Sequence, residues 1–186
     1  MKKVLLCREE DSLETRVALI PDDIKKLKNM GFEFKVVRGA GIKSGFSDES
    51  YVNAGAEVIE SADAGYADSE IVVRILKPSN IDNLKEDTLH LSYFDPFNEK
   101  ELINKFVEKK AMAVSLEMIP RTTLAQKMDV QSSQTSLAGY VAVINAAAKL
   151  PKIFPMMMTP AGTISPARVF IIGVGVAGLQ AIATAK

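Results

Sequence analysis

The sequence predicts an α/β fold, in which a doubly wound parallel sheet domain is followed by the truncated start of a second α/β domain. Short apolar runs alternate with stretches of helical spacing, as in a parallel sheet covered on both faces. With 47% hydrophobic and 25% charged residues, the chain can build a core. An apolar run at 169–172 leads into Gly-x-Gly-x-x-Gly and an Ala-rich stretch, which is typical of the start of a Rossmann dinucleotide-binding domain.

Strands are expected where short apolar runs stand between polar turns. The expected strands are 3–7, 32–37, 71–76, 89–93, 111–115 and 169–172. In the first helix, Pro21 suits the first position and Gly31 ends the segment. Between them, Ile24, Leu27 and Met30 recur at helical spacing. This order of elements predicts parallel strands joined by helices.

The later helices are expected from their caps and composition. Ser47 is expected to cap a short helix, and Asn98 with Glu101 resembles a capping box that opens another. An Ala-rich helix is expected over 137–150, and an irregular apolar crossing over 151–166.

The amino-acid composition changes near Pro120, where a polar stretch begins. We therefore expect an N-terminal α/β domain at 1–120 and a polar loop, connecting helix and crossover at 121–166. Residues 167–186 would hold the first strand, glycine turn and helix start of the second domain. The acidic residue that grips a ribose should follow the glycines by about 20 positions. The printed sequence stops before that point, so we expect it to be the N-terminal part of a longer protein.

Composition bounds the function classes. Lys+Arg and Asp+Glu balance at 23 each, which argues against a nucleic-acid or membrane surface recognised by charge. Cys7 is the single cysteine and is expected to be a buried core thiol, which fits a reducing compartment. The apolar start at 4–6 is too short for a signal peptide, and no run approaches the roughly 20 apolar residues of a membrane span.

The glycine motif carries the clearest chemistry. Gly173 permits a tight turn, Gly175 lets backbone approach a pyrophosphate, and Gly178 lets helix and strand pack closely. The helix N-terminus behind them favours negative charge. The alternative interpretation is a strand-to-helix turn that binds nothing.

A polar cluster follows Pro120. Its members are Arg121, Gln126, Asp129, Ser132, Ser133 and Gln134. If the stretch is helical, Gln126, Asp129 and Ser133 share one face, and Arg121 and Asp129 are placed to pair. Dinucleotide sites often lie at such a domain junction. The alternative is an interdomain loop with ordinary caps and one ion pair.

Three other polar residues stand near strands. Arg16 and Lys77 follow strands, where ligand residues often lie in α/β folds, although solvated basic side chains are commoner there. His90, the only histidine, lies within a strand and is expected to be packed rather than to act as a base. No spacing resembles a metal site or a nucleophilic triad.

The residues also resemble a known family. The matching segments are Arg16–Pro21, the run Pro-Arg-Thr-Thr-Leu-Ala-Gln-Lys-Met-Asp-Val-Gln-Ser-Ser-Gln at 120–134, Leu-Ala-Gly-Tyr at 137–140, Phe-Pro-Met-Met-Met-Thr at 154–159 and Gly-Val-Gly-Val-Ala-Gly at 173–178. They are similar to the NAD(H)-binding (alpha) subunits of proton-translocating NAD(P)⁺ transhydrogenases, within the alanine dehydrogenase / pyridine nucleotide transhydrogenase family. The resemblance covers the whole chain and is most specific after residue 120.

The resemblance implies hydride transfer between NADH and NADP⁺, coupled to proton movement by a membrane partner. NAD(H) would bind to this component, and NADP(H) to a partner component with its membrane domain. The full-length protein would be a homodimer, cytoplasmic and peripheral to the inner membrane through its partner subunits. The chain alone is expected to be inactive.

The resemblance also implies roles for site residues. Gln126 is the expected catalytic residue, touching the nucleotide and the incoming partner. The expected cofactor-binding residues are Arg121, Asp129, Ser132, Gly173, Gly175 and Gly178. The loop would hydrogen-bond the nicotinamide carboxamide, and an Arg–Asp pair would fix it. No acid or base is required for direct hydride transfer.

Two alternatives remain at this point. The first is an alanine-dehydrogenase-like amino-acid oxidoreductase. Alanine dehydrogenases have a catalytic histidine at the position where this chain has Phe94. They have a substrate-binding lysine at the position where this chain has Leu76, although the neighbouring Lys77 is able to substitute for it. The second alternative is a truncated, non-catalytic fragment.

Overall fold

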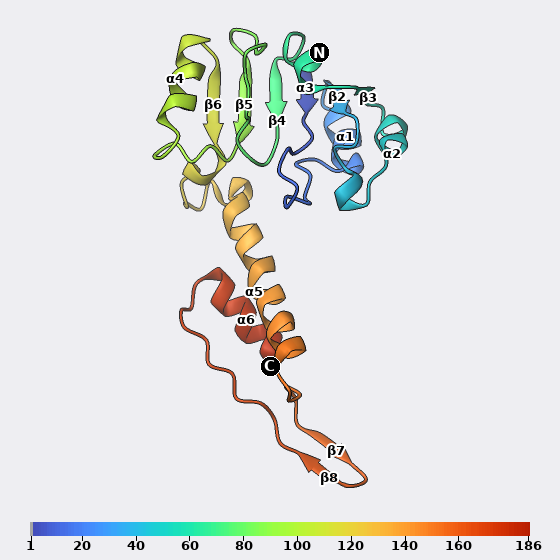
Figure 1. Cartoon of the computed structure of the whole chain (residues 1–186), viewed down its shortest axis with the longest axis vertical. Coiled ribbons are helices and arrows are strands. Elements are labelled where there is room, and N and C mark those ends of the chain that lie inside the picture. Colours follow the sequence, from blue (N-terminus) through green and yellow to red (C-terminus); the bar gives the residue numbers. More distant parts are fainter. Residues whose placement is uncertain (1) are drawn as a thin grey trace. The chain divides into compact units, whose positions relative to one another are not determined.

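The computed structural model describes residues 2–186, and the chain divides between Ile119 and Pro120 into two units (Figure 1). The first unit holds the sheet and four of the helices. The second holds two further helices and a hairpin. None of the helices within the described residues has the length and hydropathy to cross a lipid bilayer.

Six parallel strands form one sheet in the first unit, in the order β3-β2-β1-β4-β5-β6 (Figure 1). They are β1 (Lys2–Leu6), β2 (Phe32–Val37), β3 (Glu57–Ile59), β4 (Ile71–Val73), β5 (Leu89–Ser92) and β6 (Met112–Ser115). Val4 of β1 pairs with Phe34 on one side and Ile71 on the other. The strand order reverses between β1 and β4, and ligands of open α/β sheets bind beyond the carboxyl ends of such strands.

The helices of this unit are α1 (Pro21–Lys28), α2 (Asp48–Asn53), α3 (Ala62–Tyr66) and α4 (Lys100–Glu108), with short 3₁₀ turns η1 (Ile42–Ser44) and η2 (Leu116–Met118). Ser47 caps α2 as predicted, because its hydroxyl accepts the N–H of Ser50 at 3.3 Å. The capping box predicted at Asn98 is wrong. The Asn98 amide donates to Asp95 at 2.9 Å, and Glu99 occupies the N-cap of α4.

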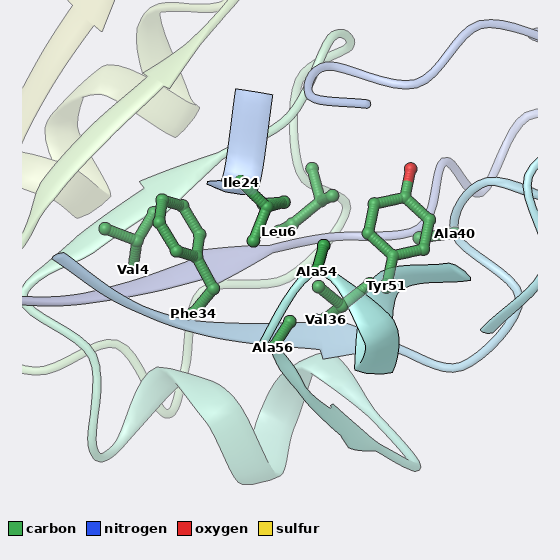
Figure 2. Close-up of a cluster of buried hydrophobic side chains, with 9 residues drawn as sticks. All are labelled: Val4, Leu6, Ile24, Phe34, Val36, Ala40, Tyr51, Ala54 and Ala56. Carbon is green, nitrogen blue, oxygen red and sulfur yellow. The ribbon is translucent and has the colours of Figure 1, made fainter. Parts of the chain in front are cut away.

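The strands bury side chains on both faces of the sheet, which confirms the doubly wound prediction. Figure 2 shows one face, where Ile24 of α1 and Tyr51 of α2 cover side chains from β1 and β2. On the other face, Tyr66 of α3 and Phe106 of α4 join a second cluster. Successive residues along the strands belong to opposite clusters. The first cluster holds Val4, Leu6, Phe34 and Val36, and the second holds Leu5, Val37 and Val72, together with Cys7 just after β1.

The second unit contains α5 (Val130–Lys149), α6 (Val176–Ala185), the 3₁₀ turn η3 (Gln126–Met128) and an antiparallel hairpin of β7 (Met157–Thr159) and β8 (Gly162–Ile164). The sequence predicts an irregular crossing where the hairpin lies. The strand predicted at 169–172 is wrong, because this segment pairs with no strand among residues 2–186. Without a neighbour to accept and donate hydrogen bonds, an apolar run does not form a strand.

Candidate functional site

The glycine turn before α6 has the backbone geometry that its motif requires. Gly173 has φ of +96°, a left-handed conformation that side chains rarely adopt. Gly175 occupies the N-cap of α6, and its carbonyl accepts the N–H of Leu179 at 2.9 Å. Within the described chain, no atom lies within 4 Å of a Cβ built on Gly175, so this backbone is open to a ligand.

Gly178, in the first turn of α6, packs against the backbone at the start of the same glycine turn. A Cβ at Gly178 would lie 2.9 Å from the carbonyl carbon of Gly173 and nearer still to its oxygen. The first turn of α6 therefore packs directly on the preceding backbone. The N–H groups of that first turn lack intrahelical acceptors, and together with the helix dipole they favour an anion.

Asp129 caps the N-terminus of α5 and holds Ser132. One carboxylate oxygen accepts the backbone N–H of Ser132 at 2.8 Å, and the other accepts its hydroxyl at 2.6 Å. The Ser132 hydroxyl, then its N–H, and to a lesser extent the charge of Arg121 hold the pKa of Asp129 below its usual value. The carboxylate is thus ionised and immobilised, a structural anchor for the loop before α5.

The predicted pair between Arg121 and Asp129 is wrong. Within the described loop, the Arg121 guanidinium donates to the side-chain oxygen of Gln131 at 2.6 Å, while Ser132 donates to both oxygens of Asp129. Arg121 still lies near enough for its charge to act on Asp129. The loop is therefore fixed by two separate hydrogen-bonded pairs.

Gln126 lies in η3 and is exposed. The prediction that Gln126 shares a helix face with Asp129 and Ser133 is wrong, because α5 begins only at Val130. The Ser133 hydroxyl instead donates to the backbone carbonyl of Asp129 at 3.1 Å. Gln126 is thus presented on a short turn beside the capped start of α5.

The carboxyl edge of the sheet in the first unit is closed by the protein's own carboxylates. Glu9, just after β1, accepts the backbone N–H groups of Ile75 and Leu76. Glu117 accepts those of Phe94 and Asp95 at 2.9 and 2.5 Å. Sequence reasoning missed both glutamates. The strand-end amides, which often bind anions in such folds, are used internally here.

A cavity of about 400 Å³ lies at this edge. Its lining includes Glu10, Arg74, Lys77, Phe94 and Glu117. Arg74, only 1% exposed, contacts Glu10 at 3.1 Å. The charge of Arg74 within the apolar run at 71–76 was the one sequence signal that pointed to these cavity residues. The cavity walls therefore carry basic groups that are already paired with carboxylates.

The basic residues that follow strands are also engaged. Lys77 forms an ion pair with Glu99. Arg16 binds both carboxylate oxygens of Glu14, at 2.8 and 2.6 Å. These contacts favour the structural interpretation of Arg16 and Lys77.

His90 and Cys7 are buried, as predicted. The His90 ring packs edge-on against Phe94 and Phe106, with centroids 5.4 Å away from each. Burial, and secondarily the charge of Arg74, lowers the pKa of His90 to about 3, and burial raises the pKa of the Cys7 thiol to about 12. At neutral pH both are uncharged and neither is suited to catalysis. Among residues 2–186, no group of three acidic, histidine or cysteine side chains is placed to hold a metal ion.

Two family models match the chain. "Alanine dehydrogenase/PNT, N-terminal domain" matches residues 5–138, and "Alanine dehydrogenase/PNT, C-terminal domain" matches residues 142–186. An NAD(P) transhydrogenase alpha-subunit polypeptide of Rhodospirillum rubrum is 38% identical, over 99% of this chain and 50% of its own length.

Solved structures show the same likeness. A transhydrogenase from Sinorhizobium meliloti matches with a TM-score of 0.92 and 40% identity, over 99% of this chain and 53% of that one. An L-alanine dehydrogenase matches with a TM-score of 0.85 and 26% identity, over 98% of this chain and 51% of that one. The chain spans about half the length of these relatives.

Proposed function

Because this chain belongs to the alanine dehydrogenase/PNT family, we propose that it is the NAD(H)-binding part of an NAD(P)⁺ transhydrogenase. The observation that carries the proposal is the glycine turn, left-handed at Gly173 and open at Gly175, at the N-terminus of α6. The pyrophosphate of NAD(H) would bind there. The similarity to transhydrogenases, at 38–40% identity, favours them over the alanine dehydrogenase at 26%.

The polar loop would orient the nicotinamide. Asp129 and Ser132 fix the start of α5, and Gln131 holds Arg121, so the loop is organised by hydrogen bonds within the chain itself. Gln126, exposed on η3, would contact the nicotinamide and the partner's nucleotide. NAD(H) itself supplies the hydride chemistry, and the protein's contribution is orientation.

The partners follow from the same proposal. An NADP(H)-binding component with a membrane domain would accept or donate the hydride, and would hold this protein at the membrane surface. The full-length protein would form a homodimer. The β7–β8 hairpin supports the homodimer, because it exposes apolar side chains, with Met158 84% exposed. Exposed apolar patches of this kind mark interaction surfaces.

An amino-acid oxidoreductase is the second candidate, favoured by the fold shared with L-alanine dehydrogenase. Oxidative deamination needs a base near the substrate carbon. Phe94, at the position expected for that base, is fully buried and packs on His90, which is itself buried and, with a pKa lowered to about 3, is too weak a base for this step. Lys77 is paired with Glu99. These contacts favour the transhydrogenase.

The test uses full-length protein with an NADP(H)-binding partner, NADPH and an oxidised NAD analogue. We expect the analogue to be reduced only when both proteins are present. In a second arm, L-alanine and NAD⁺ are supplied without the partner, and we expect no NADH to form. An alanine-dependent rise in NADH absorbance, or no reduction of the analogue, would refute the proposal.

A further inference from the structure

Gly139 lies buried in the middle of α5, where the helix meets the first turn of α6. A Cβ built on Gly139 would lie 3.0 Å from the carbonyl carbon of Ala177 and 3.1 Å from its Cα, and nearer still to the carbonyl oxygen. Carbon atoms in contact prefer about 3.5–4.0 Å. The atoms it would meet belong to the backbone, so no side chain can turn aside to make room.

Ala177 is the second residue of α6 and stands inside the glycine motif, between Gly175 and Gly178. The next residue, Gly178, packs on the carbonyl of Gly173. The first turn of α6 is therefore held on two sides by backbone contacts that only glycine permits. One of these glycines belongs to the motif, and the other lies 34 positions before its start.

The contact between the helices is part of a continuous face. The buried residues of α5 are Gly139 and Val143, four positions apart and thus on one side of the helix. Ala181, buried in α6, stands four positions after Ala177. The small residues Gly139, Ala177 and Ala181 allow close helix packing. Glycine is also the poorest helix former after proline, so its presence in the middle of a 20-residue helix is explained by the contact rather than by helix stability.

We propose that Gly139 is a positioning residue for the dinucleotide site. By allowing α5 to touch the backbone of Ala177, it fixes where the N-terminus of α6 points. Hydrogen bonds from that terminus to a phosphate depend steeply on angle and distance, and the helix dipole acts only over the first turn. A methyl group at position 139 would displace this turn. The inference rests on the proposed nucleotide site.

The test compares Gly139→Ala with Ala142→Gly in full-length protein. Ala142 is exposed on the same helix and is not one of its buried residues, so this control lowers helix propensity without changing the two buried positions of α5. Three readouts apply: NADH affinity by fluorescence titration, the transfer rate at saturating NADH, and hydrogen exchange of the Leu179 amide. We expect Gly139→Ala to raise the Kd for NADH at least tenfold and to speed exchange at Leu179 at least tenfold. The rate at saturating NADH should stay within twofold, and Ala142→Gly should leave the Kd within twofold.

Each other outcome is decisive. Wild-type Kd and exchange in Gly139→Ala would overturn the inference, and so would loss of exchange protection throughout α5, which would indicate a general packing role. If the wild-type protein bound no NADH, the proposed function would fail. The exchange of Leu179 would then decide by itself whether Gly139 positions α6.

Discussion

The carboxylate of Glu9 accepts the backbone N–H groups of Ile75 and Leu76, at 2.7 and 3.1 Å. Glu9 follows β1, and the two amides follow β4, so one side chain ties together the ends of the two central strands. The guanidinium of Arg74 lies 3.8 Å away, and both charged groups are buried. Glu9 therefore satisfies two backbone donors and neutralises a buried cation.

We expect Glu9→Ala to lower the free energy of unfolding by about 3–5 kcal/mol, because it leaves the amides of Ile75 and Leu76 without their acceptor and removes one of the two carboxylates beside Arg74, the other being Glu10. Urea unfolding measures the loss. The control is Glu60→Ala, which removes an exposed ion pair with Arg38 and should cost at most about 1 kcal/mol. Equal effects of the two substitutions would contradict this account of Glu9.

We expect the first unit to lose stability as the pH falls below 6.5. His90 is neutral in the fold, with a pKa lowered to about 3 by burial and by Arg74, while in the unfolded chain it binds a proton near its usual value of 6.5. The stabilisation is therefore complete above pH 6.5 and is lost between pH 6.5 and 3, by up to about 1.4 kcal/mol for each pH unit. Thermal unfolding across this range measures it.

The control for this pH dependence is His90→Leu. Neither ring nitrogen of His90 has a hydrogen-bond partner among the described residues, so an apolar side chain of similar size should be tolerated. The variant should unfold with a visibly shallower pH dependence than the wild type. Parallel curves for the two proteins would show that carboxylates, rather than His90, set the acid limit.

We expect Gln126→Asn in the full-length protein to slow hydride transfer more than it weakens NADH binding. Shortening the side chain by one methylene would withdraw its amide from the proposed nicotinamide contact, and a misplacement near 1 Å can cost on the order of 100-fold in rate. Stopped-flow transfer and NADH titration separate the two effects. Lys127→Gln, on the same exposed turn, is the control. An unchanged transfer rate in Gln126→Asn would remove Gln126 from the site.

We expect the 186-residue chain to fray or self-associate through its C-terminal third, and to hold NAD weakly. Phe170 and Ile172 are each 89% exposed, and the segment around them has no strand partner within residues 2–186. Hydrogen exchange should be fast at 169–172 in a monomer and slow at 4–6, in the central strand. Strong protection of 169–172 in a demonstrated monomer, or micromolar NAD affinity, would refute this prediction.

Periodicity and turn residues were enough to predict the α/β class and five of the six sheet strands. β3 (Glu57–Ile59) escaped because it is three residues long, begins with a charged residue and has no fully buried position. The strand predicted at 71–76 ends at Val73 because the amides of Ile75 and Leu76 bond to Glu9. Such an ending depends on a residue more than 60 positions away and cannot be read locally.

In the candidate site, too, some features can be predicted from the sequence and others cannot. The glycine spacing can be read directly, since each glycine answers a local backbone need. The cap of Asp129 on Ser132 was missed, because the helix was predicted to begin at 137, whereas α5 begins at Val130. The partner of Arg121 cannot be predicted from the sequence, because Asp129 and Gln131 are both polar acceptors nearby in the chain, and only the folded loop shows that Arg121 bonds to Gln131.

The strand order also governs how the chain folds as it is made. β1 leaves the ribosome before the other five strands of the sheet, yet it becomes a central strand, and Val4 must wait for Ile71 to complete its second edge. At roughly 5–20 residues per second, that wait lasts about 3–13 seconds. During this time Val4, Leu5 and Leu6 can pair only with β2, and their other edge is open to foreign strands. Until β4 is synthesised, this open edge of β1 is therefore a place where nascent chains can associate with one another.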